Sequence, residues 1–366
     1  MKVMSILGTR PELIKMSQII SKLDEHTEHI FIHTGQNYDY ELNEIFYKDL
    51  GLRRPDHFLE VVGDSLGDTL GSILFEVEKM LKLYEPEAVV ILGDTNSALA
   101  GIVAKRMKIP LFHLEAGNRC FDDNVPEEIN RRILDHIADV NMAYSENSRR
   151  YLLDEGIAKD RVFIMGSPMQ EVLIKHLAKI EKSEVLDTLK VFPEQYFMVS
   201  LHRDENTEIQ ANLDELVKTI NMIADKYEMP IILSTHPRLR KKIEQQGIIF
   251  NELVRLLKPF GFYDYIKLQM NAKVVISDSG TISEESSILG FPAITIRNAI
   301  ERPEAVDVGS ILMTGVDAEN ILKCLEVVKE PTTIPADYDV YNCSERVLKV
   351  ILGYTLYVNR YVWHKR

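Results

Sequence analysis

The stretch VVISDSGTISEES, residues 274–286, joins a short apolar run to a turn and then to a helix-like segment. A bounded apolar run of this length is consistent with a buried strand of a parallel sheet. Ser279 and Gly280 stand where the helix would begin, so that backbone N–H groups and the helix dipole would face an anion there. The stretch therefore predicts a strand–turn–helix unit with an anion site at its turn.

The same alternation of short β-branched runs and amphipathic segments continues through almost the whole chain. It predicts an α/β fold with parallel, doubly wound sheets. The amphipathic segment 169–189 separates two series of strands, so we expect two Rossmann-like domains facing a cleft, residues 1–168 and 169–343. The tail 344–366 has one apolar helical face and is expected to join the first domain. The expected strands are 3–7, 29–33, 88–92, 111–114, 140–144, 162–165, 196–200, 231–234, 254–257, 274–277 and 293–296.

The composition is that of a globular protein, with 366 residues, 45% hydrophobic and 27% charged. This chain is longer than a domain with a single hydrophobic core usually is, which agrees with two domains. The net charge of −13 argues against a general binder of nucleic acid or of anionic membranes. No stretch approaches the ~20 apolar residues of a membrane span, and the apolar run at the N-terminus is too short for a signal peptide. We therefore expect a cytoplasmic protein.

The three cysteines, Cys120, Cys324 and Cys343, are widely spaced and form no C-x-x-C motif. They predict neither a disulfide scaffold nor a zinc site. The polar run 202–206 has no cysteine or histidine cluster nearby in the sequence either. No metal site is expected.

Chemically active side chains gather at the predicted carboxyl ends of strands, where ligands bind in sheets of this kind. Each of them alone has an ordinary structural explanation. Asp94 could cap a helix, and Glu127 with Arg131 could be a solvated ion pair. Their shared position at the edges of both sheets predicts a ligand site. The residues are Arg10, Lys15, Asp94, Glu115, Glu127, Arg131, His202 and His236.

Several of these side chains suit a nucleotide diphosphate. Arg10, Lys15 and Arg302 would add charge-assisted donors to the anion site at the 279–280 turn. Glu285, one turn into the following helix, would accept hydrogen bonds from ribose hydroxyls. The chain has neither G-x-x-x-x-G-K-[ST] nor G-x-G-x-x-G, which argues against a P-loop nucleotidase and against an ordinary NAD enzyme.

The run SLHRDEN, residues 200–206, contains the letters H-R-D, which also begin the catalytic loop of protein kinases. The other kinase motifs, a glycine-rich loop, V-A-I-K, D-F-G and A-P-E, are missing from the sequence. We therefore reject the kinase interpretation and keep His202 as a strand-end candidate. Glu205 and Asn206 are expected to brace the loop or to contact a ligand.

The motifs GTRPELIKM, GDTNSALA, LEAGNRC, VPEEINRRILDH, SLHRDEN, SDSGTISEE and ERPEA occur in this order along nearly the whole chain. Together they resemble the non-hydrolysing UDP-N-acetylglucosamine 2-epimerase family. The resemblance implies a two-domain fold of the glycosyltransferase-B type, a UDP-sugar held mainly by the second domain, a homodimer, and no cofactor.

Other segments resemble the UDP-N-acetyl-L-fucosamine synthase branch, which serves capsule and O-antigen assembly. They are TGQNYDYELN, DLGLRRPDHFLE, EAGNRCFD, DSGTISEESSILGFPA and YTLYVNRYVWHKR. That branch inverts C2 of UDP-2-acetamido-2,6-dideoxy-L-talose. The common UDP-N-acetylglucosamine (UDP-GlcNAc) enzymes usually have histidine after the glutamine where this chain has Gln36–Asn37. This difference argues against activation by a second UDP-GlcNAc.

The family resemblance implies elimination of UDP across C1 and C2, followed by its re-addition. Acid–base work would then fall to Asp94, Glu115, Glu127 and His202, with Arg131 orienting the carboxylates. The resemblance also implies that Arg10, Lys15, Ser279, Gly280 and Arg302 hold the diphosphate and that Glu285 binds the ribose. Tyr265 is expected to offer an aromatic surface to the uracil ring. Two alternatives remain open: interconversion of UDP-GlcNAc and UDP-N-acetylmannosamine, and a glycosyltransferase of the same fold.

Overall fold

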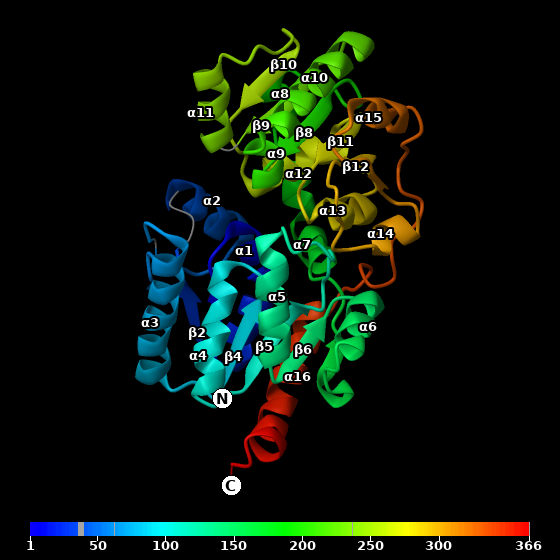
Figure 1. Ribbon diagram of the computed structural model, residues 1–366. Coiled ribbons are helices and arrows are strands. Elements are labelled where there is room, and N and C mark those ends of the chain that lie inside the picture. Colours follow the sequence, from blue (N-terminus) through cyan, green and yellow to red (C-terminus); the bar gives the residue numbers. More distant parts are fainter. Residues whose placement is uncertain (36–39, 62, 236, 366) are drawn as a thin grey trace. The chain divides into compact units, whose positions relative to one another are not determined.

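The computed structural model describes residues 1–35, 40–61, 63–235 and 237–365. The chain divides into two compact units (Figure 1). Unit 1 comprises Met1–Ile174 and Asp337–Arg366, and unit 2 comprises Lys175–Ala336.

The chain leaves and re-enters unit 1 through two segments, 169–174 and 337–343, that we expected in the second domain. Hydrogen bonds hold this part of the chain together. The Ser167 N–H donates to the Asp337 carbonyl over 2.9 Å, and Gln170 Nε2 donates to Asp339 Oδ1 over 3.1 Å. These bonds explain why both segments belong to unit 1.

Unit 1 is built on a sheet of seven described strands in which every neighbouring pair is parallel. The strand order is β3-β2-β1-β4-β5-β6-β7, so the winding reverses between β1 and β4. Ligands of doubly wound sheets bind beyond the carboxyl ends of the strands at such a switch point. The strands are β1 (Lys2–Leu7), β2 (Glu28–His33), β3 (His57–Phe58), β4 (Ala88–Leu92), β5 (Leu111–Ala116), β6 (Val140–Ala143) and β7 (Val162–Ile164).

Helices cover both faces of this sheet (Figure 1). On one face α3, α4 and α5 lie side by side, and Val77 and Leu134 enter the core there. On the other face α1 packs against α16. A capping box between Thr9 and Glu12, with a proline in the first turn, fixes the start of α1 at the end of β1. The helices are α1 (Arg10–His26), α2 (Tyr40–Leu50), α3 (Leu66–Tyr84), α4 (Gly101–Arg106), α5 (Pro126–Ile137), α6 (Glu146–Asp154) and α16 (Cys343–Tyr357), and α7 (Met169–Glu181) runs from unit 1 into unit 2.

Unit 2 repeats the same design with six described parallel strands in the order β10-β9-β8-β11-β12-β13. Its switch point lies between β8 and β11. The strands are β8 (Phe197–Leu201), β9 (Ile231–Thr235), β10 (Val254–Leu257), β11 (Val274–Ser277), β12 (Ala293–Thr295) and β13 (Leu312–Met313). The helices are α8 (Val185–Leu189), α9 (Asp204–Thr207), α10 (Gln210–Tyr227), α11 (Pro237–Gln246), α12 (Phe262–Asn271), α13 (Ile282–Leu289), α14 (Glu304–Asp307) and α15 (Ala318–Leu325).

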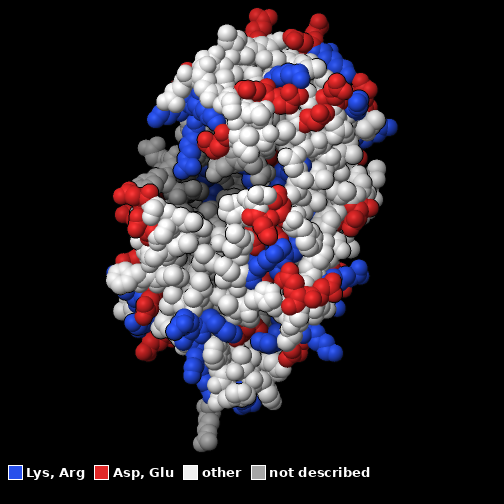
Figure 2. Space-filling view, viewed as in Figure 1, with Lys and Arg blue, Asp and Glu red and all other residues white. Residues whose placement is uncertain are grey.

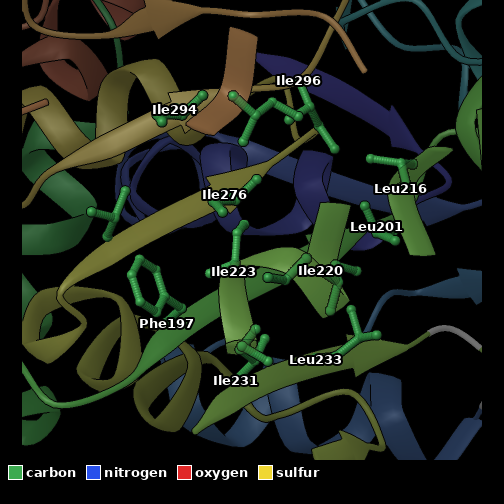
Figure 3. Packing of buried hydrophobic residues seen from close by; sticks show 14 of the residues in the cluster. Phe197, Leu201, Leu216, Ile220, Ile223, Ile231, Leu233, Ile276, Ile294 and Ile296 are labelled. Atoms are coloured by element: carbon green, nitrogen blue, oxygen red, sulfur yellow. The ribbon is translucent and has the colours of Figure 1, made fainter. Parts of the chain in front are cut away.

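Figure 3 shows the core of unit 2, where one face of α10 packs on the sheet. Leu216, Ile220 and Ile223 recur at helical spacing and are buried. They lie among aliphatic and aromatic side chains of β8, β9, β11 and β12. Full burial of each such side chain contributes about 1.5–3 kcal/mol, so this layer fixes the strands whose ends carry the candidate ligand-binding residues.

The two units carry charges of both signs. Basic and acidic side chains are interspersed over each unit on the face seen in Figure 2. Among the helices that the structure describes, none combines the length and the apolar character needed to cross a membrane.

Candidate active site

Lys15 of α1 and Glu115, near the end of β5, lie together in unit 1. Lys15 Nζ donates to Glu115 Oε2 over 2.6 Å, and both side chains are buried. Glu115 has a φ of +69°, a left-handed conformation that costs a non-glycine residue of order 1–3 kcal/mol. The β5–β6 register shifts between Leu114 and Ala116, so Glu115 stands out of the regular ladder. Backbone strain of this kind clusters at functional sites.

Asp94, beyond the end of β4, is held by Arg131 of α5. Arg131 donates to Asp94 Oδ2 twice, from Nη2 over 2.5 Å and from Nε over 3.0 Å. Its Nη1 donates to Glu128 Oε2 over 2.6 Å. The planar guanidinium thus fixes two carboxylates at once. The expected role of Arg131 in orienting catalytic carboxylates stays a prediction, and Glu128 is a partner that the sequence did not indicate.

Arg10 and Glu127 both stand in the first turn of a helix in unit 1. Arg10 begins α1, and its guanidinium carbon lies 5.9 Å from the centroid of the Phe46 ring. Glu127 follows the proline that opens α5 and is half-buried. Their assigned roles in diphosphate binding and proton transfer stay predictions.

Glu12 is a buried carboxylate that the sequence interpretation missed. It accepts hydrogen bonds from the Gly8 N–H over 2.6 Å, the Thr9 N–H over 2.9 Å and the Thr95 hydroxyl over 2.6 Å. It therefore ties the loop after β1 to the loop that carries Asp94. Burial raises the pKa of Glu12 to about 7, against 4.5 for an ordinary glutamate, and the nearby Asp94 adds to the rise. The T-x-x-E capping box was the signal that would have found it.

A fully buried network lies behind these carboxylates and ties α5 to the strand ends. His113 Nδ1 lies 2.7 Å from Asp135 Oδ1, and His113 Nε2 lies 2.9 Å from the Gly93 carbonyl, next to Asp94. Asp135 also accepts hydrogen bonds from Arg119 Nη1 over 2.7 Å and from the Gly117 N–H over 3.2 Å. Asp135 therefore links the loops after β4 and β5 to the helix that carries Arg131.

In unit 2, Asp278 organises the loop after β8. This buried carboxylate follows β11 and accepts hydrogen bonds from the backbone N–H groups of His202, over 2.8 Å, and Arg203, over 3.0 Å. Asn206 Nδ2 donates to it over 3.0 Å, so Asn206 braces the loop. The two loops at the switch point of this sheet are thereby joined.

The imidazole of His202 is half exposed and contacts the hydroxyl group of Ser200. Its Nδ1 lies 3.2 Å from Ser200 Oγ, and the Tyr265 hydroxyl donates to the same Ser200 Oγ over 3.1 Å. Burial raises the pKa of Tyr265, so its phenol stays a donor. The structure thus links Tyr265 to the surroundings of His202, while its expected contact with uracil stays a prediction.

The expected turn–helix unit is present, with α13 beginning at Ile282 rather than at Gly280. Ser279 N–H donates to Ser277 Oγ over 3.1 Å, which fixes the turn. Glu285 is buried and accepts hydrogen bonds from the Thr281 hydroxyl over 2.8 Å and from Gln269 Nε2 over 2.9 Å. These two hydrogen bonds hold the carboxylate of Glu285 in one orientation. The role of Glu285 in ribose binding stays a prediction.

Arg302 closes over the turn in unit 2 and donates to the Gly280 carbonyl. A small pocket lies at this point. Arg297 and Glu301 line this pocket and were not indicated by the sequence. Glu301 is the first residue of the ERPE motif. The lining residues are Ser279, Gly280, Ser283, Thr295, Arg297, Ile300, Glu301 and Arg302.

Three residues of the sequence interpretation, Gln36, Asn37 and His236, lie outside the described residues. Within the ranges 1–35, 40–61, 63–235 and 237–365, no group of three or more His, Cys, Asp and Glu side chains is arranged to hold a metal ion.

Two Rossmann-like units with polar residues at both switch points define an α/β enzyme of the glycosyltransferase-B type. The family model described as UDP-N-acetylglucosamine 2-epimerase matches residues 21–352. The chain belongs to this family, whose members are isomerases.

Several proteins named UDP-N-acetylglucosamine 2-epimerase are similar to this chain over most of their length. A UDP-N-acetylglucosamine 2-epimerase of Methanococcus maripaludis is 41% identical over 89% of this chain and 91% of the relative. The solved UDP-N-acetylglucosamine 2-epimerase of Rickettsia bellii is 46% identical with a TM-score of 0.92, and each chain is covered completely. The Methanocaldococcus jannaschii UDP-GlcNAc 2-epimerase, solved in complex with UDP-GlcNAc and UDP, is 34% identical over 96% of this chain and all of that chain, with a TM-score of 0.90.

Proposed function

We propose that this chain interconverts UDP-GlcNAc and its C2 epimer, UDP-N-acetylmannosamine. The proposal is carried by two carboxylates, Glu115 and Asp94, that are each bound to a buried cation at the switch point of unit 1. Family membership supports an epimerase. The names of the relatives favour UDP-GlcNAc over the L-fucosamine substrate that the sequence first suggested.

The chemistry requires proton transfer at C2 without a cofactor that would acidify it. A base removes the C2 proton while the C1–O bond breaks, which leaves a 2-acetamidoglycal and UDP. Protonation of C2 from the opposite face and re-addition of UDP at C1 then give the epimer. Acid–base groups must flank C2, and the departing diphosphate needs cations and backbone amides.

We assign proton transfer mainly to unit 1 and UDP binding mainly to unit 2. Lys15 and Arg131 hold Glu115 and Asp94 in fixed positions, as a pair of opposed acid–base groups requires. In unit 2 the turn at Ser279–Gly280, with Arg302 beside it, suits an anion. The full set for proton transfer is Asp94, Glu115, Glu127 and His202, with Arg131 as orienting group. The set for UDP is Arg10, Lys15, Tyr265, Ser279, Gly280, Glu285 and Arg302.

A second candidate substrate is UDP-2-acetamido-2,6-dideoxy-L-talose, whose C2 epimer is UDP-N-acetyl-L-fucosamine. It is favoured by the segments 49–60 and 354–366, which resemble that branch, and it would place the enzyme in capsule or O-antigen synthesis. The elimination chemistry is the same for both sugars. The substrate is therefore decided by assay and not by the reaction type.

The decisive experiment is incubation of the enzyme with each sugar nucleotide in D2O, followed by NMR. We expect deuterium at C2 of UDP-GlcNAc and the appearance of the second epimer. Exchange with the L-talose compound alone would reassign the substrate, and exchange with neither would refute the epimerase proposal. A glycosyltransferase would show no wash-in of deuterium without an acceptor.

We also propose a homodimer, on the basis of the family resemblance. Light scattering coupled to gel filtration tests this, with the 42.0 kDa mass of one chain as the reference. An elution mass of a single chain at assay concentration would contradict it.

A further inference from the structure

Glu301 is a buried carboxylate among arginines in unit 2. It is 5% exposed, and its Oε1 accepts hydrogen bonds from Arg297 Nη2 over 2.6 Å and from Arg203 Nη2 over 3.3 Å. Arg203 follows β8 and Arg297 follows β12, the strands on either side of β11. One carboxylate therefore connects the two loops that flank the turn after β11.

These groups converge on Gly280. A Cβ atom at Gly280 would lie 3.1 Å from Arg302 Nη1, 3.7 Å from Glu301 Oε2 and 3.8 Å from Arg297 Nη1. Arg297 is 4% exposed, and its Nε has no hydrogen-bond partner among the residues that the structure describes. The missing side chain at Gly280 thus leaves the turn open to at least two guanidinium groups.

A negative charge at this place needs an explanation. A carboxylate beside an anion site weakens anion binding by direct repulsion. The same carboxylate keeps like-charged guanidinium groups in one arrangement, which preserves the fork geometry that arginine offers to phosphate. The first effect acts against a nucleotide ligand and the second acts in its favour.

We infer that Glu301 is a positioning residue that holds Arg297 and Arg203 in place to receive the diphosphate of the nucleotide at the Ser279–Gly280 turn. This inference rests on the proposed function, which places UDP at that turn. The two effects of the carboxylate have opposite signs, so the direction of a change in affinity distinguishes them. Loss of the charge strengthens UDP binding if repulsion dominates and weakens it if positioning dominates.

The test is calorimetric titration of the full chain and of Glu301→Gln with UDP and with UMP. We expect UDP to bind the variant roughly ten-fold or more weakly, the size of effect expected for loss of a charge-assisted hydrogen bond. UMP, which lacks the second phosphate, should lose less. Glu301→Asp keeps the charge but shortens its reach by one methylene group, and it should also weaken UDP binding.

Glu215→Gln is the matched control, because it removes the same charge from α10, where the partly exposed Glu215 pairs with Lys218. Its UDP affinity should equal that of the wild type. Unchanged or tighter UDP binding by Glu301→Gln, or equal losses for UDP and UMP, would refute the positioning role. If circular dichroism shows that Glu301→Gln does not fold, wild-type affinity of Glu301→Asp refutes it instead. Failure of the wild-type chain to bind UDP would refute the proposed function as well. Normal UDP binding by the wild type, with unchanged binding by Glu301→Gln, would refute the positioning role alone.

Discussion

Replacing Asp135 by asparagine should lower the free energy of unfolding of unit 1 by about 3 kcal/mol. Asp135 is fully buried and stands 2.7 Å from both His113 Nδ1 and Arg119 Nη1. Removing one partner of a buried ion pair costs about 3–5 kcal/mol, because the other charge remains buried without compensation. The asparagine keeps one acceptor oxygen, and Arg119 keeps a second carboxylate, Glu155. We therefore expect the lower end of that range.

Urea unfolding followed by tryptophan fluorescence measures this effect in the right unit, because the single tryptophan, Trp363, belongs to unit 1. With an m-value of about 2–3 kcal/mol/M, the midpoint should fall by about 1–1.5 M. Glu155→Gln is the control: its carboxylate is partly exposed, so the loss should stay below about 1 kcal/mol. A midpoint for Asp135→Asn within about 0.3 M of the wild type, or a larger shift for the control, would refute the reasoning.

Three further predictions concern unit 1. Glu115→Gln should abolish turnover in the NMR assay and leave UDP affinity largely intact in calorimetry; lost UDP binding would instead indicate a structural role. Arg131→Lys keeps the charge but loses the two-pronged contact with Asp94, so kcat should fall roughly ten-fold or more, and a wild-type kcat would contradict this. Glu12 has a pKa raised from 4.5 to about 7 in the folded state, so the stability that its proton contributes is present below pH 4.5 and is lost as the pH rises through 7. Between pH 5 and 7 the wild type should therefore lose stability relative to Glu12→Gln, by about 1.4 kcal/mol per pH unit at most, and a pH-independent difference in urea unfolding would contradict this.

The sheets were predictable because their central strands are continuous apolar runs. Residues 88–92 read AVVIL, and β4 occupies these residues with every side chain buried, as expected for a strand covered on both faces. The sequence does not predict β3 and β13, because each has two residues and carries no periodicity. Whether such a short edge strand forms depends on the neighbouring strand with which it pairs.

The candidate site was predictable where a side chain lies at or just beyond the end of a strand, as Glu115 and Asp94 do. The partners of these carboxylates were not predictable. Lys15 and Glu115 are 100 residues apart in the chain, and Arg131 is 37 residues beyond Asp94. Which side chains meet across a sheet depends on strand register and on the rotation of each helix about its axis, and both are set by packing between distant segments.

α5 shows why this rotation is hard to predict. Ile129 and Ile133, four residues apart, form the apolar pair that would ordinarily face the core, yet they are 52% and 37% exposed. Burial of two isoleucines would contribute about 1.5–3 kcal/mol each, so an opposing set of interactions must be larger. That set consists of the ion pairs of Arg131 with Asp94 and Glu128 and of Arg119 with Asp135, which would leave buried charges uncompensated if α5 turned. The contact between Asp135 and His113 would be lost as well. The local pattern and the structure disagree on the helix that carries Glu127 and Arg131, and such disagreement is expected at functional sites. The inward-facing residues of α5 are Glu128, Asn130, Arg131, Leu134 and Asp135.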